Sequence, residues 1–255
     1  MISCKPGGYA ALVWSVVLFA SVGCSTTQPT GFALDAKSAE QRLVELRKNP
    51  VPLDRPVVIL DGFLDPGFGS LSYRNELTQV TGDERVLRVT YVTASSIAEC
   101  AERALDEIDA AFPGEAVDVI GISMGGVVAF HVADAGRVEV ARIFTLSSPL
   151  RGARMANLPT WLGLQRDLRP DSDATAALPG MIERFAGTRV HYAGVTDQTV
   201  RVDEAAPPGE TAHVLPNNGM ARWGHTGVIR DPRVRLDIFL RLRNQPPITP
   251  TTLPR

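Results

Sequence analysis

The sequence predicts an α/β fold, with a mainly parallel central sheet and helices on both of its faces. Segments with the apolar spacing of helices alternate along the chain with short β-branched segments that are typical of buried strands. This alternation is the pattern of a parallel sheet with helical crossovers. A length of 255 residues suits one domain of this class, and no seam within the chain marks a second one.

The expected elements follow one another in a regular order. Helical patterns cover residues 38–48, 96–112 and 124–136, and a final helix begins at an Asp-Pro pair at 231–232. Strand patterns cover residues 56–60, 85–92, 116–121, 141–146 and 188–195. We expect the helix at 96–112 to open with a capping box between Ser96 and Glu99.

Residues 1–23 have the composition of an export signal. Lys5 precedes a mainly apolar run from Ala10 to Val22, and small residues follow this run. The run has thirteen residues, whereas a helix that spans a bilayer needs ~20. The stretch "SVGC" that ends at Cys24 resembles the bacterial lipobox, which implies cleavage before Cys24 and lipidation of this cysteine. An uncleaved anchor is the alternative interpretation.

The remaining chain divides into three parts. Residues 24–37 begin with a polar, uncharged stretch and form a tether, residues 38–245 form the α/β domain, and residues 246–255 form a C-terminal tail. With a lipidated Cys24, the domain would be exported and held at a membrane surface in the cell envelope.

Charge and cysteine content exclude several classes of function. The chain has 26 basic and 28 acidic residues, so it carries no positive excess that would attract nucleic acid. Cys100 has no partner for a disulfide once Cys4 and Cys24 are assigned to the N-terminal segment, and its place on the apolar side of a helical pattern predicts a buried thiol. The sequence shows no closely spaced group of metal ligands, so we expect neither a metal nor an organic cofactor.

A G-x-S-x-G motif, formed by Gly121, Ser123 and Gly125, joins a predicted strand to a predicted helix. Ligands bind beyond the carboxyl ends of parallel strands, so the motif lies where a site is expected. A serine at such a sharp turn is held in a strained conformation that exposes its hydroxyl, and small residues must flank it. The helix that follows would aim the N–H of Met124 at a developing oxyanion. A tight turn without catalytic function is the alternative.

These residues resemble the nucleophile elbow of the α/β-hydrolase superfamily, in its lipase and esterase branch. The resemblance extends over most of residues 56–240: "VVILDGFLDPG" is similar to the first strand and oxyanion loop, and "LSSPLRGARMA" to a segment after a later strand. It implies an α/β-hydrolase fold and a serine ester hydrolase that works through a Ser-His-Asp triad. By position in the motif, the backbone N–H of Phe63 would be the second oxyanion donor.

A serine nucleophile needs a base, and the base needs an orienting acid. His225 is the last of four histidines, lies in a glycine-flanked loop before the final helix, and resembles the histidine loop of the superfamily. Asp197 follows the strand at 188–195 and matches the acid position, with Asp203 and Glu204 as alternatives. His131, His191 and His213 lie in helix or strand patterns and are expected to be structural: none of the three is in a loop.

Asp61 departs from the superfamily pattern, which usually has histidine at this position. A carboxylate beside an oxyanion would repel it unless the side chain turned away or paired with a cation such as Arg151 or Arg74. Asp61 therefore favours the alternative function, a catalytically silent surface lipoprotein that uses the same scaffold for binding.

The sequence limits the size of the expected substrate but does not identify it. Residues 151–181 form either a short cap over the pocket or a plain connection between strands. Their modest length favours a small or medium acyl ester, including an envelope lipid, over a long acyl chain held in a deep tunnel. Thioester or amide cleavage would use the same machinery, and the oligomeric state is not determined by the sequence.

Overall fold

The computed structural model describes residues 31–63, 65, 68–159 and 162–250. The predicted export signal, Cys24 and the start of the tether therefore lie outside the described residues. At the centre is a sheet of six strands in the order β2-β1-β3-β4-β5-β6, with every neighbouring pair parallel. The strands are β1 (Val57–Leu60), β2 (Val86–Val89), β3 (Val117–Ile122), β4 (Val140–Leu146), β5 (Thr188–Gly194) and β6 (His213–Leu215).

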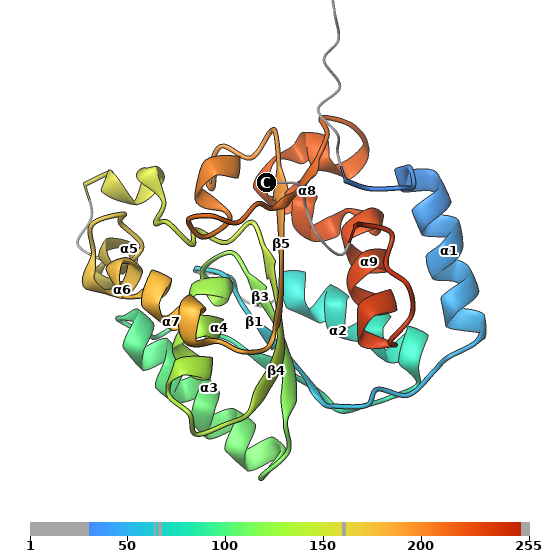
Figure 1. Ribbon diagram of the computed structural model, residues 1–255, viewed down its shortest axis with the longest axis horizontal. Helices are drawn as coiled ribbons and strands as arrows, with labels where there is room; N and C mark the ends of the chain where they lie inside the picture. Colours follow the sequence, from blue (N-terminus) through green and yellow to red (C-terminus); the bar gives the residue numbers. More distant parts are fainter. Residues whose placement is uncertain (1–30, 64, 66–67, 160–161, 251–255) are drawn as a thin grey trace, which may run out of the picture.

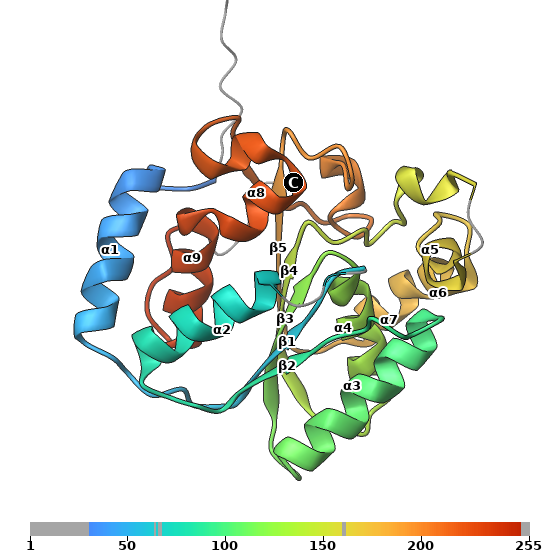
Figure 2. The ribbon, with the colours of Figure 1, turned by 180° about the vertical axis from the view of Figure 1, so that it is seen from behind.

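Helices cover both faces of this sheet, as the sequence predicted (Figures 1 and 2). One face carries α3 (Ile97–Ala111), α4 (Met124–Asp134) and α7 (Leu178–Arg184). The other carries α1 (Ala36–Lys48), α2 (Phe68–Thr81), α8 (His225–Arg230) and α9 (Pro232–Leu242). Among the described residues, no helix is both long and apolar enough to span a membrane.

The sheet separates two hydrophobic cores, one on each face, and successive side chains of a strand point alternately into one core and the other. In β1, Val58 and Leu60 pack into the core beneath α3 and α4, whereas Val57 and Ile59 pack into the core beneath α1, α2 and α9. All four are fully buried, so β1 reads as a continuous apolar run, as expected for a central parallel strand. Cys100 is buried in the first core, as predicted, and burial raises the pKa of its thiol to about 12.

The start of α3 differs in one detail from the predicted capping box. The Ser96 hydroxyl accepts a hydrogen bond from the backbone N–H of Glu99 at 3.1 Å, as expected. The carboxylate of Glu99, however, accepts from the backbone N–H of Ser95 at 2.7 Å and not from that of Ser96. The reciprocal bond is therefore displaced by one residue.

Two helices that lie near the carboxyl edge, α2 and α8, are among those that were not predicted. α2 begins in a segment that we interpreted as a loop, and its buried face includes Ser70, Glu76 and Thr81, which interrupt the apolar pattern. α8 begins at His225 itself, in a second segment interpreted as a loop. Both helices start close to the carboxyl edge of the sheet and therefore shape the site described below (Figure 2).

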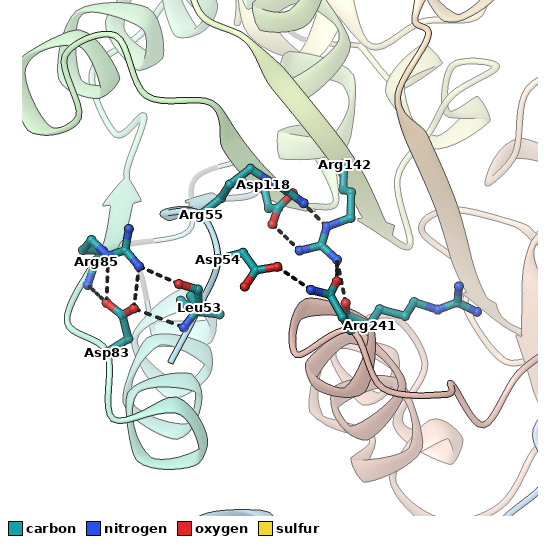
Figure 3. Close-up of polar contacts among 9 residues, drawn as sticks. Leu53, Asp54, Arg55, Asp83, Arg85, Asp118, Arg142 and Arg241 are labelled. Atoms are coloured by element: carbon teal, nitrogen blue, oxygen red, sulfur yellow. Dashed lines mark hydrogen bonds and ion pairs between the residues drawn. The ribbon is translucent and has the colours of Figure 1, made fainter. Parts of the chain in front are cut away.

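A buried ion pair joins several elements at the opposite, amino edge of the sheet (Figure 3). Asp118 is fully buried at the start of β3, and Arg142 of β4 donates to both of its carboxylate oxygens, at 2.9 and 2.6 Å. Arg55 adds a contact of 3.3 Å, and Arg142 also donates to the carbonyl of Arg241 at the end of α9. One arginine thus connects the sheet to the last helix, far from the carboxyl edge.

Residues 246–250, part of the predicted tail, lie against the domain. The backbone N–H groups of Ile248 and Thr249 both donate to the carboxylate of Asp237 at 2.8 Å. The carbonyl of Ile248 accepts from the N–H of Ala33 at 2.9 Å, so the two ends of the described chain meet here.

Candidate active site

Ser123 lies at the turn between β3 and α4. Its backbone has φ 52° and ψ −120°, a conformation that a residue with a side chain rarely adopts. This conformation is fixed by the elements around the serine: β3 ends directly before it and α4 starts directly after it. The N–H of Ser123 also donates to the carbonyl of Leu146 on β4 at 2.8 Å. Strain of this kind is typical of functional turns.

The glycines on either side of the serine are required by close backbone approaches. A Cβ atom at Gly121 would lie 2.4 Å from the Cα of Gly126, and one at Gly125 would lie 2.1 Å from the carbonyl oxygen of Leu60. Both distances are far inside van der Waals contact. The motif is therefore packed so tightly between β1 and α4 that only glycine fits at both positions.

His225 and Asp197 are brought together by two other loops of the same edge. The Nδ1 atom of His225 lies 2.8 Å from the Oδ2 atom of Asp197, and a carboxylate can only accept, so the ring donates. Gly224, directly before the histidine, has φ 64° and turns the chain so that α8 begins at His225. The described Asp197 side chain is fully buried and that of His225 is 20% exposed.

Asp197 is held by its own turn as well as by the histidine. Its Oδ1 atom accepts from the backbone N–H groups of Thr199 and Val200, at 2.9 and 3.0 Å. Burial by itself raises the pKa of Asp197, but the hydrogen bond and charge of His225 and the N–H of Val200 outweigh this effect and lower the pKa below its ordinary value. The carboxylate is thus ionised at neutral pH.

The two alternative acids lie elsewhere. Asp203 forms an exposed ion pair of 2.7 Å with Arg154. Glu204 is buried, and its carboxylate accepts from the backbone N–H groups of Arg154 and Arg201. Neither carboxylate makes a contact with His225 in the described part of the chain, so Asp197 is the acid that meets the histidine.

Ser123 and His225 line one cavity of about 320 Å³ at the carboxyl edge of the sheet. Its described lining also includes apolar side chains, polar side chains and two glycines: Phe63, Ile122, Ile229, Asp65, Thr226, Arg230, Gly62 and Gly69. A volume near 300 Å³ is at the lower end of the range for small-molecule sites. Larger cavities elsewhere in the described residues contain none of these side chains.

The predicted oxyanion loop lies against the serine. A Cβ atom at Gly62 would be only 3.3 Å from the Cβ of Ser123, so the backbone of this loop approaches the nucleophile closely. Phe63 follows Gly62 and lines the cavity, and Met124 is fully buried at the first position of α4. The two residues predicted as backbone donors therefore both belong to segments next to Ser123.

Asp61 is fully buried, and its side chain is not among those that line the cavity. Neither of its carboxyl oxygens makes a hydrogen bond within the described residues. Burial raises the pKa of Asp61 to about 6. The Ser70 side chain and the positive charge of Arg88 each lower this pKa, but their effect is smaller than that of burial. The carboxyl group is thus directed into the protein, beside α2 and β2.

Neither arginine that was offered as an example of a pairing cation contacts the Asp61 carboxyl group within the described residues. Arg151 donates instead to two backbone carbonyls at 206–207, at 2.8 and 3.1 Å. Arg74 lies 3.6 Å from the carboxylate of Glu84. The positive charge that acts on the Asp61 carboxyl group, lowering its pKa, is that of Arg88 on β2.

The other three histidines make contacts typical of structural residues. The Nε2 atom of His131 lies 3.2 Å from the carbonyl oxygen of Ala174. His191 is buried in β5, with Nδ1 2.8 Å from the hydroxyl of Thr145. His213 is buried in β6, and burial lowers its pKa to about 4.

The segment 151–181 folds into short helices, including α5 (Gly163–Asp167) and α6 (Asp173–Ala176). These helices lie beside α7 and near the start of α3 (Figure 1), where the carboxylate of Asp167 accepts from the backbone N–H of Ile97 at 2.9 Å. None of the described residues between 151 and 181 lines the cavity at Ser123. A cap function for this segment remains a prediction.

Comparison with solved structures shows which fold this architecture represents. The mature form of the lipase BlEst2 from Bacillus licheniformis superposes with a TM-score of 0.57 at 17% identity, covering 77% of this chain and 94% of that one. The chain has the α/β-hydrolase fold. A metagenome-derived lipolytic enzyme superposes with a TM-score of 0.56 at 12% identity, covering 76% of this chain and 95% of that one.

An esterase from Thermogutta terrifontis is a third neighbour, with a TM-score of 0.50 at 20% identity, covering 76% of this chain and 91% of that one. No protein-family model and no curated protein sequence matches the chain. At these identities the neighbours show the fold, and the site must be argued from its own geometry.

Several residues around the site were not identified from the sequence. Thr226, Ile229 and Arg230 line the cavity because α8 continues past His225, a consequence of the helix that we did not predict. Ser147, at the end of β4, has φ 48° and is fully buried. Its segment, directly after a strand, lies where the sequence predicts a site, but no role was assigned to the serine itself. No group of three or more His, Cys, Asp or Glu side chains in the described ranges is placed to hold a metal ion.

Proposed function

We propose that the protein is a serine hydrolase that cleaves acyl esters through Ser123, His225 and Asp197. The observation that carries this proposal is the 2.8 Å hydrogen bond from His225 to Asp197, made by a histidine that shares its cavity with Ser123. The fold neighbours, which include lipases and esterases, agree with this chemistry.

In the proposed mechanism each group has one role. His225 takes the proton of the Ser123 hydroxyl through Nε2, because its Nδ1–H is already donated to Asp197. The serine oxygen attacks the carbonyl carbon of the ester, and the backbone N–H groups of Phe63 and Met124 stabilise the oxyanion. The protonated histidine then gives its proton to the departing alcohol, which leaves an acyl group on Ser123.

A water molecule completes the reaction by the same route. His225 removes a proton from the water, which attacks the acyl carbon and releases the carboxylic acid, and the proton returns to Ser123. The buried, ionised Asp197 stabilises the imidazolium that forms in each half of the reaction. Asp61 does not oppose this step directly, because its carboxyl group lies outside the cavity lining.

A cavity of about 320 Å³ favours small acyl groups. We therefore expect acetyl and butyryl esters of nitrophenol to be cleaved with a higher kcat/KM than dodecanoyl or longer esters. Ser123→Ala should lower kcat/KM by at least ~10³-fold. The matched control is Ser72→Ala, an exposed serine on α2, which should keep the activity of the original chain.

The alternative is a silent scaffold that binds without turnover. Asp61 was the feature that favoured it, and the burial of its carboxyl group away from the cavity removes that support. Folded protein that hydrolyses none of the esters in the series, whatever the acyl length, would establish the silent scaffold instead.

We further propose that the mature chain begins at a lipidated Cys24 and acts in the cell envelope. The support is the apolar run of residues 10–22, followed by "SVGC". Mass spectrometry of the mature N-terminus tests this: a diacylglyceryl adduct on Cys24 is the expected result, and an unmodified N-terminus at another residue would contradict it.

A further inference from the structure

Exposed apolar side chains gather beside the proposed catalytic histidine. Trp223 is 61% exposed, Val195 is 48% exposed and Met220 is 36% exposed. Trp223 precedes His225 by two residues, and Val195 precedes Asp197 by two. A large exposed tryptophan is uncommon on a protein surface that faces only water.

These residues belong to one continuous surface. Met220 and Trp223 lie on a short 3₁₀ helix (Gly219–Trp223), whose residue Ala221 accepts a hydrogen bond from the Thr196 hydroxyl. The same helix packs on α8, because a Cβ atom at Gly227 would lie 2.1 Å from the carbonyl oxygen of Met220. The strand-end loop, the 3₁₀ helix and α8 thus form a single surface around the opening of the cavity.

This surface also carries positive charge. The guanidinium of Arg222 lies over the ring of Trp223, 5.2 Å from its centroid. Arg230 lines the cavity at the end of α8. Neither arginine makes an ion pair within the described residues, whereas Arg154 and Arg201, farther along the same edge, share Asp203. The region around Trp223 therefore has free cationic groups next to apolar ones.

The N-terminal end of the described chain lies at the same surface. The ring of Phe32 is 6.3 Å from that of His213 on β6, and the Cβ of Ala36 would be 3.3 Å from a Cβ at Gly219. Figures 1 and 2 both show the beginning of α1 at the same end of the molecule as α8. Gly31 follows Cys24 by only seven positions, and a fully extended chain of that length spans at most ~25 Å.

We propose that the surface formed by Val195, Met220, Arg222 and Trp223 docks on an anionic lipid bilayer, with the Ser123 cavity facing the membrane. Tryptophan is the side chain best suited to the headgroup region, and arginine is attracted to anionic lipids. An anchor at Cys24, seven positions before Gly31, keeps the bilayer within reach of this end of the molecule. The orientation rests on the proposed lipid anchor, and it does not require that the protein hydrolyse esters.

The depth of Trp223 in the membrane tests the proposal. The full chain is reconstituted into vesicles of phosphatidylcholine and phosphatidylglycerol, with or without bromine on the acyl chains as a fluorescence quencher. The difference in emission between the original chain and Trp223→Phe isolates Trp223 from Trp161, since the proposed mature chain that begins at Cys24 no longer contains Trp14. We expect this difference spectrum to be shifted to the blue and to lose intensity in brominated vesicles.

Val51 provides a matched control, since it is also exposed, at 39%, but precedes β1 at the amino edge of the sheet. A tryptophan introduced by Val51→Trp in the Trp223→Phe chain should show no quenching. Equal quenching at both positions, or none at Trp223 in vesicles that hold the protein, would overturn the proposed orientation. Arg222→Gln, or vesicles without phosphatidylglycerol, should reduce the quenching of Trp223, and unchanged quenching in both would refute the part played by anionic lipid.

Failure of this proposal is distinguishable from failure of the proposed function. Trp223→Phe should cleave a soluble acetyl ester of nitrophenol at the original rate, because Trp223 does not line the cavity. Cleavage without quenching rejects the docking surface alone, and quenching without cleavage rejects the hydrolase alone.

Discussion

The side chains of Asp197 and His225 meet across 28 residues of sequence, with Oδ2 of the carboxylate 2.8 Å from Nδ1 of the imidazole. The other carboxylate oxygen is occupied by two N–H groups of the turn that contains Asp197. A turn aspartate that satisfies its own backbone is common. Here the same residue serves both purposes, because the turn fixes the carboxylate in the orientation that the histidine requires.

Asp197→Asn should lower kcat of the proposed ester hydrolysis by ~10⁴-fold, the order of loss when a triad carboxylate becomes an amide. The amide keeps the shape of the side chain but cannot stabilise an imidazolium. Steady-state kinetics on a short nitrophenyl ester measure the loss. Asp203→Asn is the control: it removes an exposed carboxylate that pairs with Arg154, and its activity should remain unchanged. Equal losses in the two variants would show that the acid is misassigned.

Gly125→Ala should destabilise the domain by ~3 kcal/mol or more, because the added methyl group would lie 2.1 Å from a backbone oxygen that cannot move away freely. Thermal unfolding or the yield of soluble protein measures the effect. In contrast, Gly180→Ala places a methyl group 3.3 Å from the flexible end of Arg184, within α7, and should be tolerated. A Gly125→Ala protein as stable as the Gly180→Ala protein would contradict the tight packing described for the elbow.

Asp61 should make the protein less stable as the pH rises. In the unfolded chain its carboxyl group loses a proton near pH 4, whereas in the folded protein its pKa is raised to about 6 by burial. Between these values the folded state holds a proton that the unfolded state has released, so the free energy of unfolding falls with rising pH and stays lower above pH 6. A shift of this size corresponds to about 3 kcal/mol.

Asp61→Asn should therefore gain stability relative to the original chain between pH 4 and about 7, as measured by denaturant unfolding at a series of pH values. Asp203→Asn, which alters an exposed carboxylate, should show no such gain. A constant difference between Asp61→Asn and the original chain across this range would contradict the raised pKa.

Arg142→Met should destabilise the protein by ~3 kcal/mol, since it leaves the buried carboxylate of Asp118 with only the more distant Arg55 (Figure 3). Arg137→Met is the control. Arg137 also contacts acidic side chains, but it is 40% exposed, so its loss should cost less than ~1 kcal/mol. Similar denaturant midpoints for the two variants would show that the amino-edge ion pair adds no special stability.

The longer strands and the helices α1, α3, α4 and α9 followed from local sequence patterns. β1 is buried on both faces, so its apolar run is unbroken, and Pro113-Gly114 marks the end of α3. α2 did not follow, because its buried face carries polar residues such as Glu76, which pairs with Arg235 on α9. A pattern of apolar spacing cannot reveal a helix whose burial depends on a partner 159 residues away.

The residues of the candidate site likewise include some that local sequence identifies and others that depend on packing between distant segments. Ser123 could be identified because its requirements are local: two glycines within the same five-residue motif, with a strand pattern before the motif and a helix pattern after it. The direction of the Asp61 side chain could not be predicted, since it depends on the space left by α2 and β2 in the folded protein. Arg230 was missed for a similar reason, because it reaches the cavity only through the position of α8.

Covalent labelling by a fluorophosphonate is the sharpest test of Ser123 as a nucleophile, because the reagent reacts with a serine whose hydroxyl is activated by a base. We expect one adduct on the folded protein, located at Ser123 by peptide mass spectrometry, absent from Ser123→Ala and retained in Ser72→Ala. A folded protein that forms no adduct, or that forms it on another residue, would show that Ser123 is not the nucleophile.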